Sequence, residues 1–243
     1  MRDILKYSNE YLKESFEEIQ VAYRRKKVLE IMKKYSPKRI IEIGCGVQPI
    51  FEFWDSFDKY CFFEPSDVFF NIAKRKSNED NRIKGYNEPF SVHQDLMDFN
   101  SDFIICSSLL HEIDTPFEMI MNIRCLCNKD TVVHINVPNA CSFHRLLAKH
   151  MGIINDVKML SERNISLQQN KVFDLDELKN MLEESGFRIM ESGSYFIKPF
   201  SHSQMYEMLK AEILNEKILN GLYDLGEEIQ GIGSEIYVNC KRL

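Results

Sequence analysis

The strongest indication of the fold is the stretch Arg39-Ile-Ile-Glu-Ile-Gly-Cys-Gly46. Its first five residues are mostly apolar and β-branched, which is typical of a strand that is buried on both faces of a sheet. Two glycines then break the strand. Because glycine has no Cβ, a ligand can approach the backbone closely at such a turn. The stretch therefore predicts a buried parallel strand that ends in a ligand-binding turn.

Strand and helix signals alternate after this stretch. The expected strands lie at residues 59–64, 83–86, 102–107, 131–137, 187–191 and 234–240, and the expected helices at 66–76, 116–127, 175–185 and within 202–226. Asp174 is the expected N-cap of the third of these helices, and Gly186 its left-handed stop. The alternation predicts an α/β fold with a Rossmann-like, doubly wound sheet that is mostly parallel and has an antiparallel last strand.

Two segments lie outside this alternation. Residues 1–36 carry recurring apolar positions that are typical of one or two amphipathic helices, so we expect an N-terminal helical lid ahead of a domain at 37–243. A packing stripe without a lid role is the alternative. Residues at about 140–172 interrupt the domain with a basic, histidine-containing stretch and a polar loop. We interpret them as a cap insertion that covers the site.

Composition and charge exclude several classes of protein. Of 243 residues, 44% are hydrophobic and 28% are charged, as in an ordinary soluble globular protein. No run approaches the roughly 18 consecutive apolar residues that cross a bilayer, and the first residues form no apolar signal core, so we expect a cytoplasmic protein without a membrane partner. The formal net charge of -6 argues against nucleic acid as the main partner. The sequence does not indicate an oligomeric state.

A second expected strand ends in an acidic residue, Glu64, eighteen positions after Gly46. A carboxylate at about this spacing contacts ribose hydroxyls in nucleotide-binding folds. A dinucleotide fold would have a third glycine where this chain has Pro49, and the sequence has no Gly-Lys-Ser/Thr motif for phosphates. These features favour an adenosine ligand that lacks phosphates. S-adenosylmethionine is such a ligand.

Several segments, in family order, resemble the class I S-adenosylmethionine-dependent methyltransferases, and more narrowly the small-molecule group that includes the ubiquinone-type enzymes. They are Ile40-Ile-Glu-Ile-Gly-Cys-Gly46, Phe62-Phe-Glu-Pro-Ser66, Ser101-Asp-Phe-Ile-Ile-Cys-Ser-Ser-Leu-Leu-His-Glu-Ile113, Asn136-Val-Pro-Asn139, the Glu-Ser-Gly-Phe end of 178–187, and Gly233-Ser-Glu-Ile-Tyr-Val238. The resemblance covers about residues 38–240. It implies transfer of a methyl group from S-adenosylmethionine, with S-adenosylhomocysteine as product.

The resemblance also implies which residues hold the cofactor. By position, these are Gly44, Cys45 and Gly46 along the methionine part, Glu64 on the ribose hydroxyls with Pro65 beside it, Ser107 near the amino group or sulfonium, and Glu42 at the amino end. The residue that contacts adenine stays open, because Asn87, Glu88 and Asp95 all lie near the expected place. The substitution of Gln48 and Pro49 for the family's third glycine leaves the loop shape open.

Methyl transfer mainly requires that the reacting atoms are held in line and that water is excluded. An acceptor that is protonated at neutral pH also needs a base, and histidine is the natural candidate. We therefore expect His111 and His144 to be catalytic, and Glu112, Asn139 and Arg145 to bind the substrate. A structural histidine at a strand end is the alternative for His111, and a solvated basic helix face is the alternative for His144 and Arg145.

The expected acceptor is a small polar or anionic metabolite, methylated on oxygen and less often on nitrogen, because a cation and an imidazole suit such groups. By analogy with the family, it is a sugar or a phosphate-containing precursor of a bacterial surface polysaccharide or natural product. We expect no metal, because Glu112 and Asp114 form no recognisable ligand set with the histidines. The alternatives are a non-catalytic S-adenosylmethionine-binding protein and a nicotinamide-dependent oxidoreductase, against which Pro49 argues.

Overall fold

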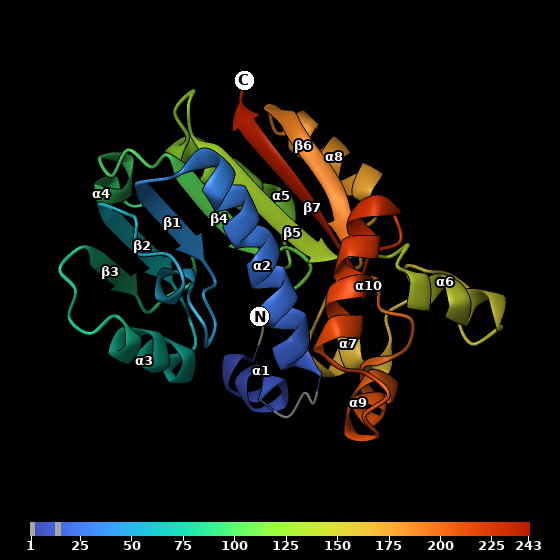
Figure 1. Ribbon diagram of the computed structural model, residues 1–243. Coiled ribbons are helices and arrows are strands. Elements are labelled where there is room, and N and C mark those ends of the chain that lie inside the picture. Colours follow the sequence, from blue (N-terminus) through green and yellow to red (C-terminus); the bar gives the residue numbers. More distant parts are fainter. Residues whose placement is uncertain (1–2, 13–15) are drawn as a thin grey trace.

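A single mixed sheet forms the centre of the computed structural model (Figure 1). The structure describes residues 3–12 and 16–243, and within them seven strands pair in the order β3-β2-β1-β4-β5-β7-β6. The strands are β1 (Arg39–Ile43), β2 (Lys59–Phe63), β3 (Ile83–Tyr86), β4 (Phe103–Ser107), β5 (Val132–Pro138), β6 (Phe187–Tyr195) and β7 (Glu235–Arg242). The first five are parallel, and β7 runs antiparallel to both β5 and β6. The predicted mostly parallel sheet with an antiparallel last strand is confirmed.

The strand order changes direction between β1 and β4, which are neighbours in the sheet. Open α/β sheets bind ligands in the crevice beyond the carboxyl ends of the strands at such a switch point. Ile43 is paired with Cys106, so the glycine turn after β1 and Ser107 at the end of β4 leave the sheet side by side. The topology therefore places two of the expected cofactor segments together.

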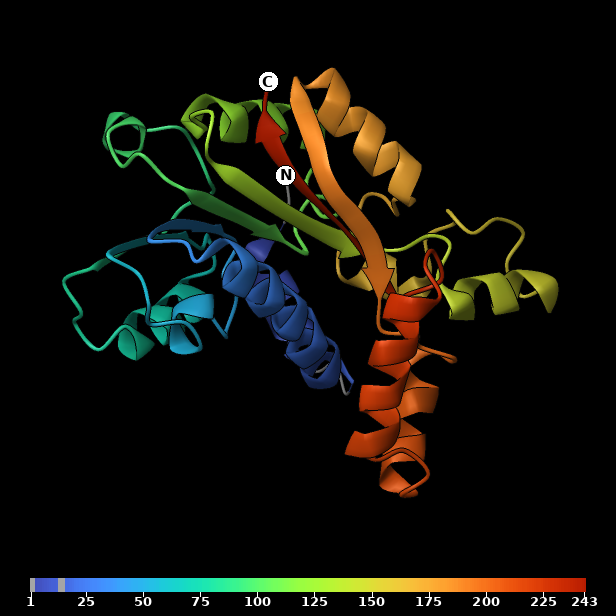
Figure 2. The same cartoon turned by 45° about the horizontal axis from the view of Figure 1, so that its top comes forward.

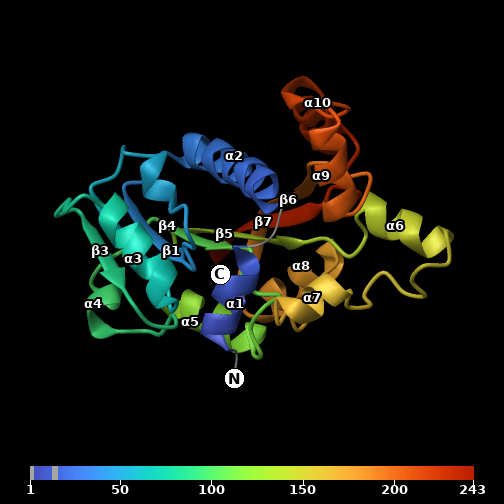
Figure 3. The same ribbon diagram turned by 90° about the horizontal axis from the view of Figure 1, so that it is seen from below.

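Alternate residues of the strands build two hydrophobic cores, one on each face of the sheet. Ile40 belongs to the core that contains α2 (Glu17–Tyr35), whereas Ile41 belongs to the core that contains α5 (Pro116–Leu126) and α8 (Leu175–Glu184). Figure 3 shows α2 on one side of the sheet and α5 and α8 on the other. Both faces are covered, which explains why the strand sequences are almost continuously apolar.

The two N-terminal helices take different positions. Helix α2 packs on the sheet, whereas α1 (Ile4–Tyr11) lies beyond the carboxyl ends of the parallel strands (Figure 1). Ser8 Oγ lies 2.8 Å from Ser66 Oγ, and the ring of Tyr11 contacts Phe69 with the centroids 5.8 Å apart. Helix α1 thus docks on the start of α3 (Asp67–Lys76). Residues 1, 2 and 13–15 of the expected lid lie outside the described part.

The remaining short helices are η1 (Ile50–Glu52), α4 (Gln94–Met97), α6 (Phe143–His150) and α7 (Glu162–Ser166), of which the last two belong to the expected cap insertion. The C-terminal region differs from the expectation of one helix within 202–226. It forms α9 (His202–Lys210) and α10 (Glu216–Glu228), which lie together beyond the sheet in Figure 2. The chain divides there because the Asn215 side chain accepts the Ile218 N–H and starts a new helix.

Candidate functional site

A cavity of about 680 Å³ opens at the switch point of the sheet. Its wall combines the turn after β1, the ends of β2 and β4, both N-terminal helices, the 140–172 segment and the regions around His202 and Glu235. Small-molecule and cofactor pockets typically have volumes of about 300–1,000 Å³. The cavity is therefore large enough for a nucleoside cofactor together with part of an acceptor.

The glycine turn forms one end of this cavity. Gly44 and Gly46 have φ angles of +76° and +58°, a region that favours glycine over residues with a Cβ. The Gly44 N–H donates to the carbonyl of Phe63 at 2.9 Å, which ties the turn to β2. A Cβ on Gly46 would meet no protein atom within 4 Å. The backbone at Gly46 thus borders open space, as the close approach of a ligand requires.

Glu64 points at the same turn. Its Oε2 accepts the Gly46 N–H at 2.9 Å and its Oε1 accepts the Ser66 N–H at 2.9 Å, and both Glu64 and Pro65 line the cavity. A carboxylate that two backbone N–H groups orient toward a cavity is a strong hydrogen-bond acceptor for hydroxyl groups. The arrangement fits a ribose.

Glu42 lies behind the turn and is buried. Its carboxylate accepts the Tyr60 hydroxyl at 2.6 Å and the Ile50 N–H at 3.2 Å. Burial raises the pKa of Glu42 to about 7, although the hydrogen bonds from Tyr60 and Ile50 act against the shift. After the turn, Pro49 leads only into η1, and the first N–H of η1 already bonds Glu42. This part of the chain offers no free helix N-terminus for a pyrophosphate.

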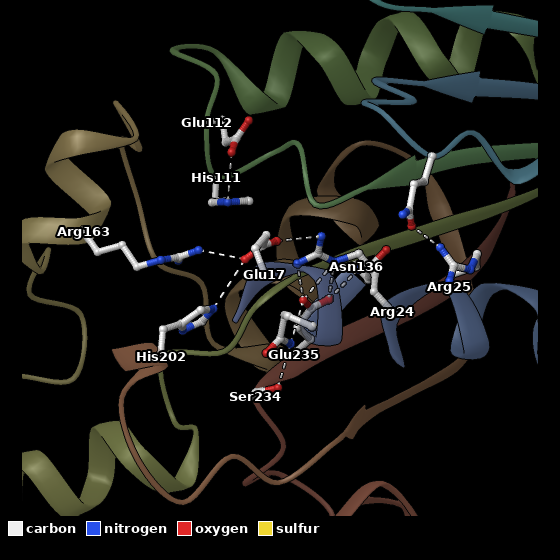
Figure 4. Close-up of polar contacts among 12 residues, drawn as sticks. Glu17, Arg24, Arg25, His111, Glu112, Asn136, Arg163, His202, Ser234 and Glu235 are labelled. Carbon is white, nitrogen blue, oxygen red and sulfur yellow. Dashed lines mark hydrogen bonds and ion pairs between the residues drawn. The ribbon is translucent and has the colours of Figure 1, made fainter. Parts of the chain in front are cut away.

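The segment after β4 brings His111 and Glu112 to the cavity, next to Ser107. His111 Nε2 lies 3.6 Å from Glu112 Oε1, and the Tyr7 hydroxyl donates to the same oxygen at 3.3 Å. Figure 4 shows the imidazole and the carboxylate together above the centre of the site. The His111 carbonyl accepts the Asn170 N–H at 2.9 Å. Both the N-terminal helix and the 140–172 segment are therefore joined to this histidine-containing turn.

His144 faces the cavity from α6. Its Nδ1 is buried and has no hydrogen-bond partner among residues 3–12 and 16–243. Burial lowers its pKa well below the ordinary value, and the charges of Lys198, Arg145 and Arg163 act in the same direction. The lowered pKa favours the neutral imidazole at pH 7.

Asn139 and Arg145 line the cavity, but their polar groups form hydrogen bonds with the backbone. Asn139 donates to the carbonyls of Gly231 and Gly233 at 2.9 and 2.8 Å and accepts the Cys141 N–H at 2.9 Å. Arg145 donates to the carbonyl of Val157 at 2.7 Å and to that of Met159. These contacts give both residues a positioning role for the loops around the cavity. Their predicted contact with substrate stays a prediction.

A buried ionic network among residues that line the cavity was not predicted from the sequence (Figure 4). Arg24 donates from Nε to both oxygens of Glu235 at 2.9 and 3.0 Å, and Arg163 donates to Glu17 at 2.8 Å. His202 Nε2 lies 3.4 Å from Glu17. Burial alone would raise the pKa of Glu17, but the nearby His202 imidazole and the two arginine charges lower it below its ordinary value. The network joins α2, α7, α9 and β7.

The family of the chain follows from its sequence. Residues 15–192 match the model of the methyltransferase domain. The chain belongs to this methyltransferase family. No curated protein matches the sequence significantly.

Solved structures share the fold of this methyltransferase. An S-adenosylmethionine-dependent methyltransferase from Mesorhizobium loti is 13% identical, with 84% of this chain and 90% of that chain covered and a TM-score of 0.57. Magnesium protoporphyrin IX methyltransferase from Synechocystis PCC 6803, solved with S-adenosylhomocysteine, is 13% identical, with 93% and 86% covered and a TM-score of 0.57. The [4+2]-cyclase SpnF is 13% identical, with 84% and 75% covered and a TM-score of 0.53.

The family and these folds support a class I methyltransferase with S-adenosylmethionine as cofactor. The narrower ubiquinone-type group stays a prediction. Within the described residues, no group of three or more His, Cys, Asp and Glu side chains is placed to hold a metal ion. The same part of the methyltransferase contains no helix that is long and apolar enough to span a membrane.

Proposed function

We propose that this chain transfers the methyl group of S-adenosylmethionine to an oxygen, with nitrogen as the second choice, of a small polar or anionic acceptor. The observation that carries the proposal is the hydrogen bond between Glu64 and the Gly46 amide at the mouth of a large cavity, within a methyltransferase domain. A sugar or phosphate-containing precursor of a surface polysaccharide or natural product is the acceptor class that the sequence resemblance favours.

The residues of the turn and of the strand ends would hold the cofactor. Glu64 would accept hydrogen bonds from the ribose hydroxyls, because its carboxylate lines the cavity and is oriented by two backbone donors. The backbone from Gly44 to Gly46, Glu42 and Ser107 all line the cavity and would hold the methionine part. When bound, the cofactor supplies an electrophilic methyl group on a sulfonium.

The acceptor would lie on the other side of the cavity, where His111 and His144 are the two candidate bases. A neutral imidazole nitrogen takes the proton that an acceptor hydroxyl releases as it is methylated. His144 is neutral because of its burial. His111 is positioned beside Glu112, which favours the imidazolium once the proton has arrived. The chain thus contributes alignment and a proton acceptor.

The N-terminal lid and the cap insertion would exclude water from this reaction. Asp3 and Gln168 are joined by two hydrogen bonds, from the Asp3 N–H to Oε1 at 2.8 Å and from Nε2 to the Asp3 carbonyl at 2.9 Å. These bonds connect the residue before α1 to the segment just after α7, next to cavity-lining residues of both segments. The contact supports lid and cap roles for segments 1–36 and 140–172. Water exclusion strengthens the positioning effect on which methyl transfer depends.

Calorimetric titration with S-adenosylmethionine, S-adenosylhomocysteine and NAD tests the cofactor directly. We expect binding of the first two and none of NAD. A panel of sugars, sugar phosphates, phenols and hydroxy acids, assayed by formation of S-adenosylhomocysteine, then tests the reaction. Cofactor binding without turnover on any acceptor would favour a non-catalytic binding protein. Binding of NAD alone would favour an oxidoreductase.

A further inference from the structure

Lys198 is a buried lysine at the acceptor end of the cavity, between β6 and α9, and no sequence motif pointed to it. Only 4% of the residue is exposed. Its Nζ lies 2.7 Å from Nδ1 of His202, and among the described residues no carboxylate lies within ion-pair distance of it. A buried amine without a carboxylate partner is costly in its charged form.

The two carboxylates whose charges act on Lys198 already have other cationic partners. Glu17 is paired with Arg163 at 2.8 Å, and Glu235 with Arg24 at 2.5 Å. Arg24 also lies 3.4 Å from Glu17, so the two carboxylates and the two guanidinium groups form one cluster. A charged Lys198 would therefore be a third cation acting on two carboxylates that already have cationic partners.

The imidazole of His144 faces the same cavity from α6 and is the second polar group of the inferred site. Its buried Nδ1 has no partner in the described ranges. Lys198 and His144 line the same cavity, and the charge of Lys198 contributes to the lowered pKa of the His144 imidazole. An ammonium and an imidazole N–H are the donors that a carboxylate or a phosphate binds.

We propose that the methyl acceptor carries an oxyanion, a carboxylate or a phosphate, which binds to the Nζ of Lys198 and to the imidazole of His144. The inference rests on the proposed methyl transfer, because it assigns a binding site to the acceptor of that reaction. His144 then holds the acceptor, and His111 remains as the base.

Binding at this site takes up a proton from solvent. Burial and the charge of Arg163 lower the pKa of Lys198 to about 7, while Glu17 and Glu235 act in the opposite direction. An oxyanion stabilises the charged amine, so the anion complex holds a proton on Nζ that the free site lacks above pH 7. Affinity for the anion therefore falls as pH rises. The other titratable and charged groups that face this region are Arg24, His144, Arg145 and His202.

The test uses protein saturated with S-adenosylhomocysteine, titrated calorimetrically with inorganic sulfate and separately with benzoate at pH 6.5 and pH 8.5. Neither probe changes its charge between these values. We expect saturable binding of at least one probe, several-fold weaker at pH 8.5. Stronger binding of sulfate identifies a phosphate acceptor, and stronger binding of benzoate identifies a carboxylate.

Four variants make the assignment specific. Lys198→Met is expected to weaken anion binding about tenfold or more, as loss of a charge-assisted hydrogen bond does. Lys198→Arg should keep the binding and lose most of its pH dependence, because a guanidinium stays charged. Lys149→Met, which removes an exposed lysine on the same helix as His144, should change nothing. His144→Asn provides a second test if Lys198→Met does not fold.

Wild-type anion affinity in both Lys198→Met and His144→Asn, or no saturable binding of either probe, would overturn the inference. A fall in affinity for S-adenosylhomocysteine in Lys198→Met would also overturn it, because the lysine would then serve the cofactor. Failure of the wild-type protein to bind S-adenosylhomocysteine is a separate result, and it contradicts the proposed function instead.

Discussion

The Oε2 of Glu64 accepts a hydrogen bond of 2.9 Å from the amide N–H of Gly46, which ties the end of β2 to the turn after β1. The other oxygen of the same carboxylate accepts the Ser66 N–H at 2.9 Å. Two backbone donors fix the carboxylate before any ligand arrives. Ligand binding therefore loses little conformational entropy at this side chain. A preorganised acceptor for ribose hydroxyls is the result.

Replacement of Glu64 by glutamine should weaken S-adenosylhomocysteine binding about tenfold to a hundredfold. A neutral amide loses the charge-assisted bonds to the ribose, which contribute roughly 1.5–3 kcal/mol. Isothermal titration calorimetry measures the effect. Glu118→Gln, which changes an exposed glutamate on α5, is the matched control. Unchanged affinity in Glu64→Gln would show that this carboxylate does not hold the nucleoside.

Gly46 and Gly152 form a matched pair of positions. Their φ angles are +58° and +72°, and a Cβ on either would meet no atom within 4 Å. Substitution by alanine should therefore cost each variant about 1–2 kcal/mol of unfolding free energy through backbone strain alone. Only Gly46 borders the cavity, so only Gly46→Ala should also weaken binding of S-adenosylhomocysteine. Urea unfolding and calorimetry separate the two effects, and equal cofactor affinity in both variants would contradict the placement.

Glu42 should make stability depend on pH. Its pKa is raised by burial from 4.5 to about 7, so the folded chain keeps a proton that the unfolded chain loses between these values. Stability then falls as pH rises from about 4.5 to 7 and levels off above. Glu42→Gln removes this slope, so its stability relative to wild type should rise by about 3 kcal/mol from pH 4 to pH 8. Urea unfolding across this range checks it, and a difference that does not change with pH would refute it.

Arg24→Met should destabilise the fold by about 3–5 kcal/mol, because it leaves the buried carboxylate of Glu235 without its cation. Adding Glu235→Gln to this variant should recover part of the loss. Arg75→Met, at an exposed position on α3, should stay within about 0.5 kcal/mol of wild type. Chemical denaturation measures all three variants. A loss in Arg24→Met no larger than that in Arg75→Met would mean that the ion pair contributes nothing to stability.

The strand positions were predictable because each strand is a local apolar run. The expected strand at 83–86 coincides with β3, and that at 59–64 differs from β2 by one residue. Strand β6 continues to Tyr195, four residues past the expected end at 191. Ser192, Gly193 and Ser194 lack an apolar pattern, and their strand conformation comes from pairing with β7. Such pairing depends on a distant segment and leaves no local signal.

Some residues of the candidate site were also predictable from local sequence, and others were not. Glu64 and Gly46 were predictable as a pair because they end neighbouring strands that lie close in sequence. The partnership of Arg24 with Glu235 spans 211 positions, so no spacing rule links the two residues. Lys198 likewise follows a strand without any motif, and only its burial beside His202 marks it. Charge partners drawn from opposite ends of the chain become visible only in the folded molecule.

A crystal structure of the protein with S-adenosylhomocysteine tests the central claim most directly. We predict that both ribose hydroxyls lie within about 2.6–3.2 Å of the Glu64 carboxylate oxygens, with the sulfur turned toward the His111 side of the cavity. A nucleoside bound elsewhere, with neither ribose hydroxyl in contact with Glu64, would contradict the account.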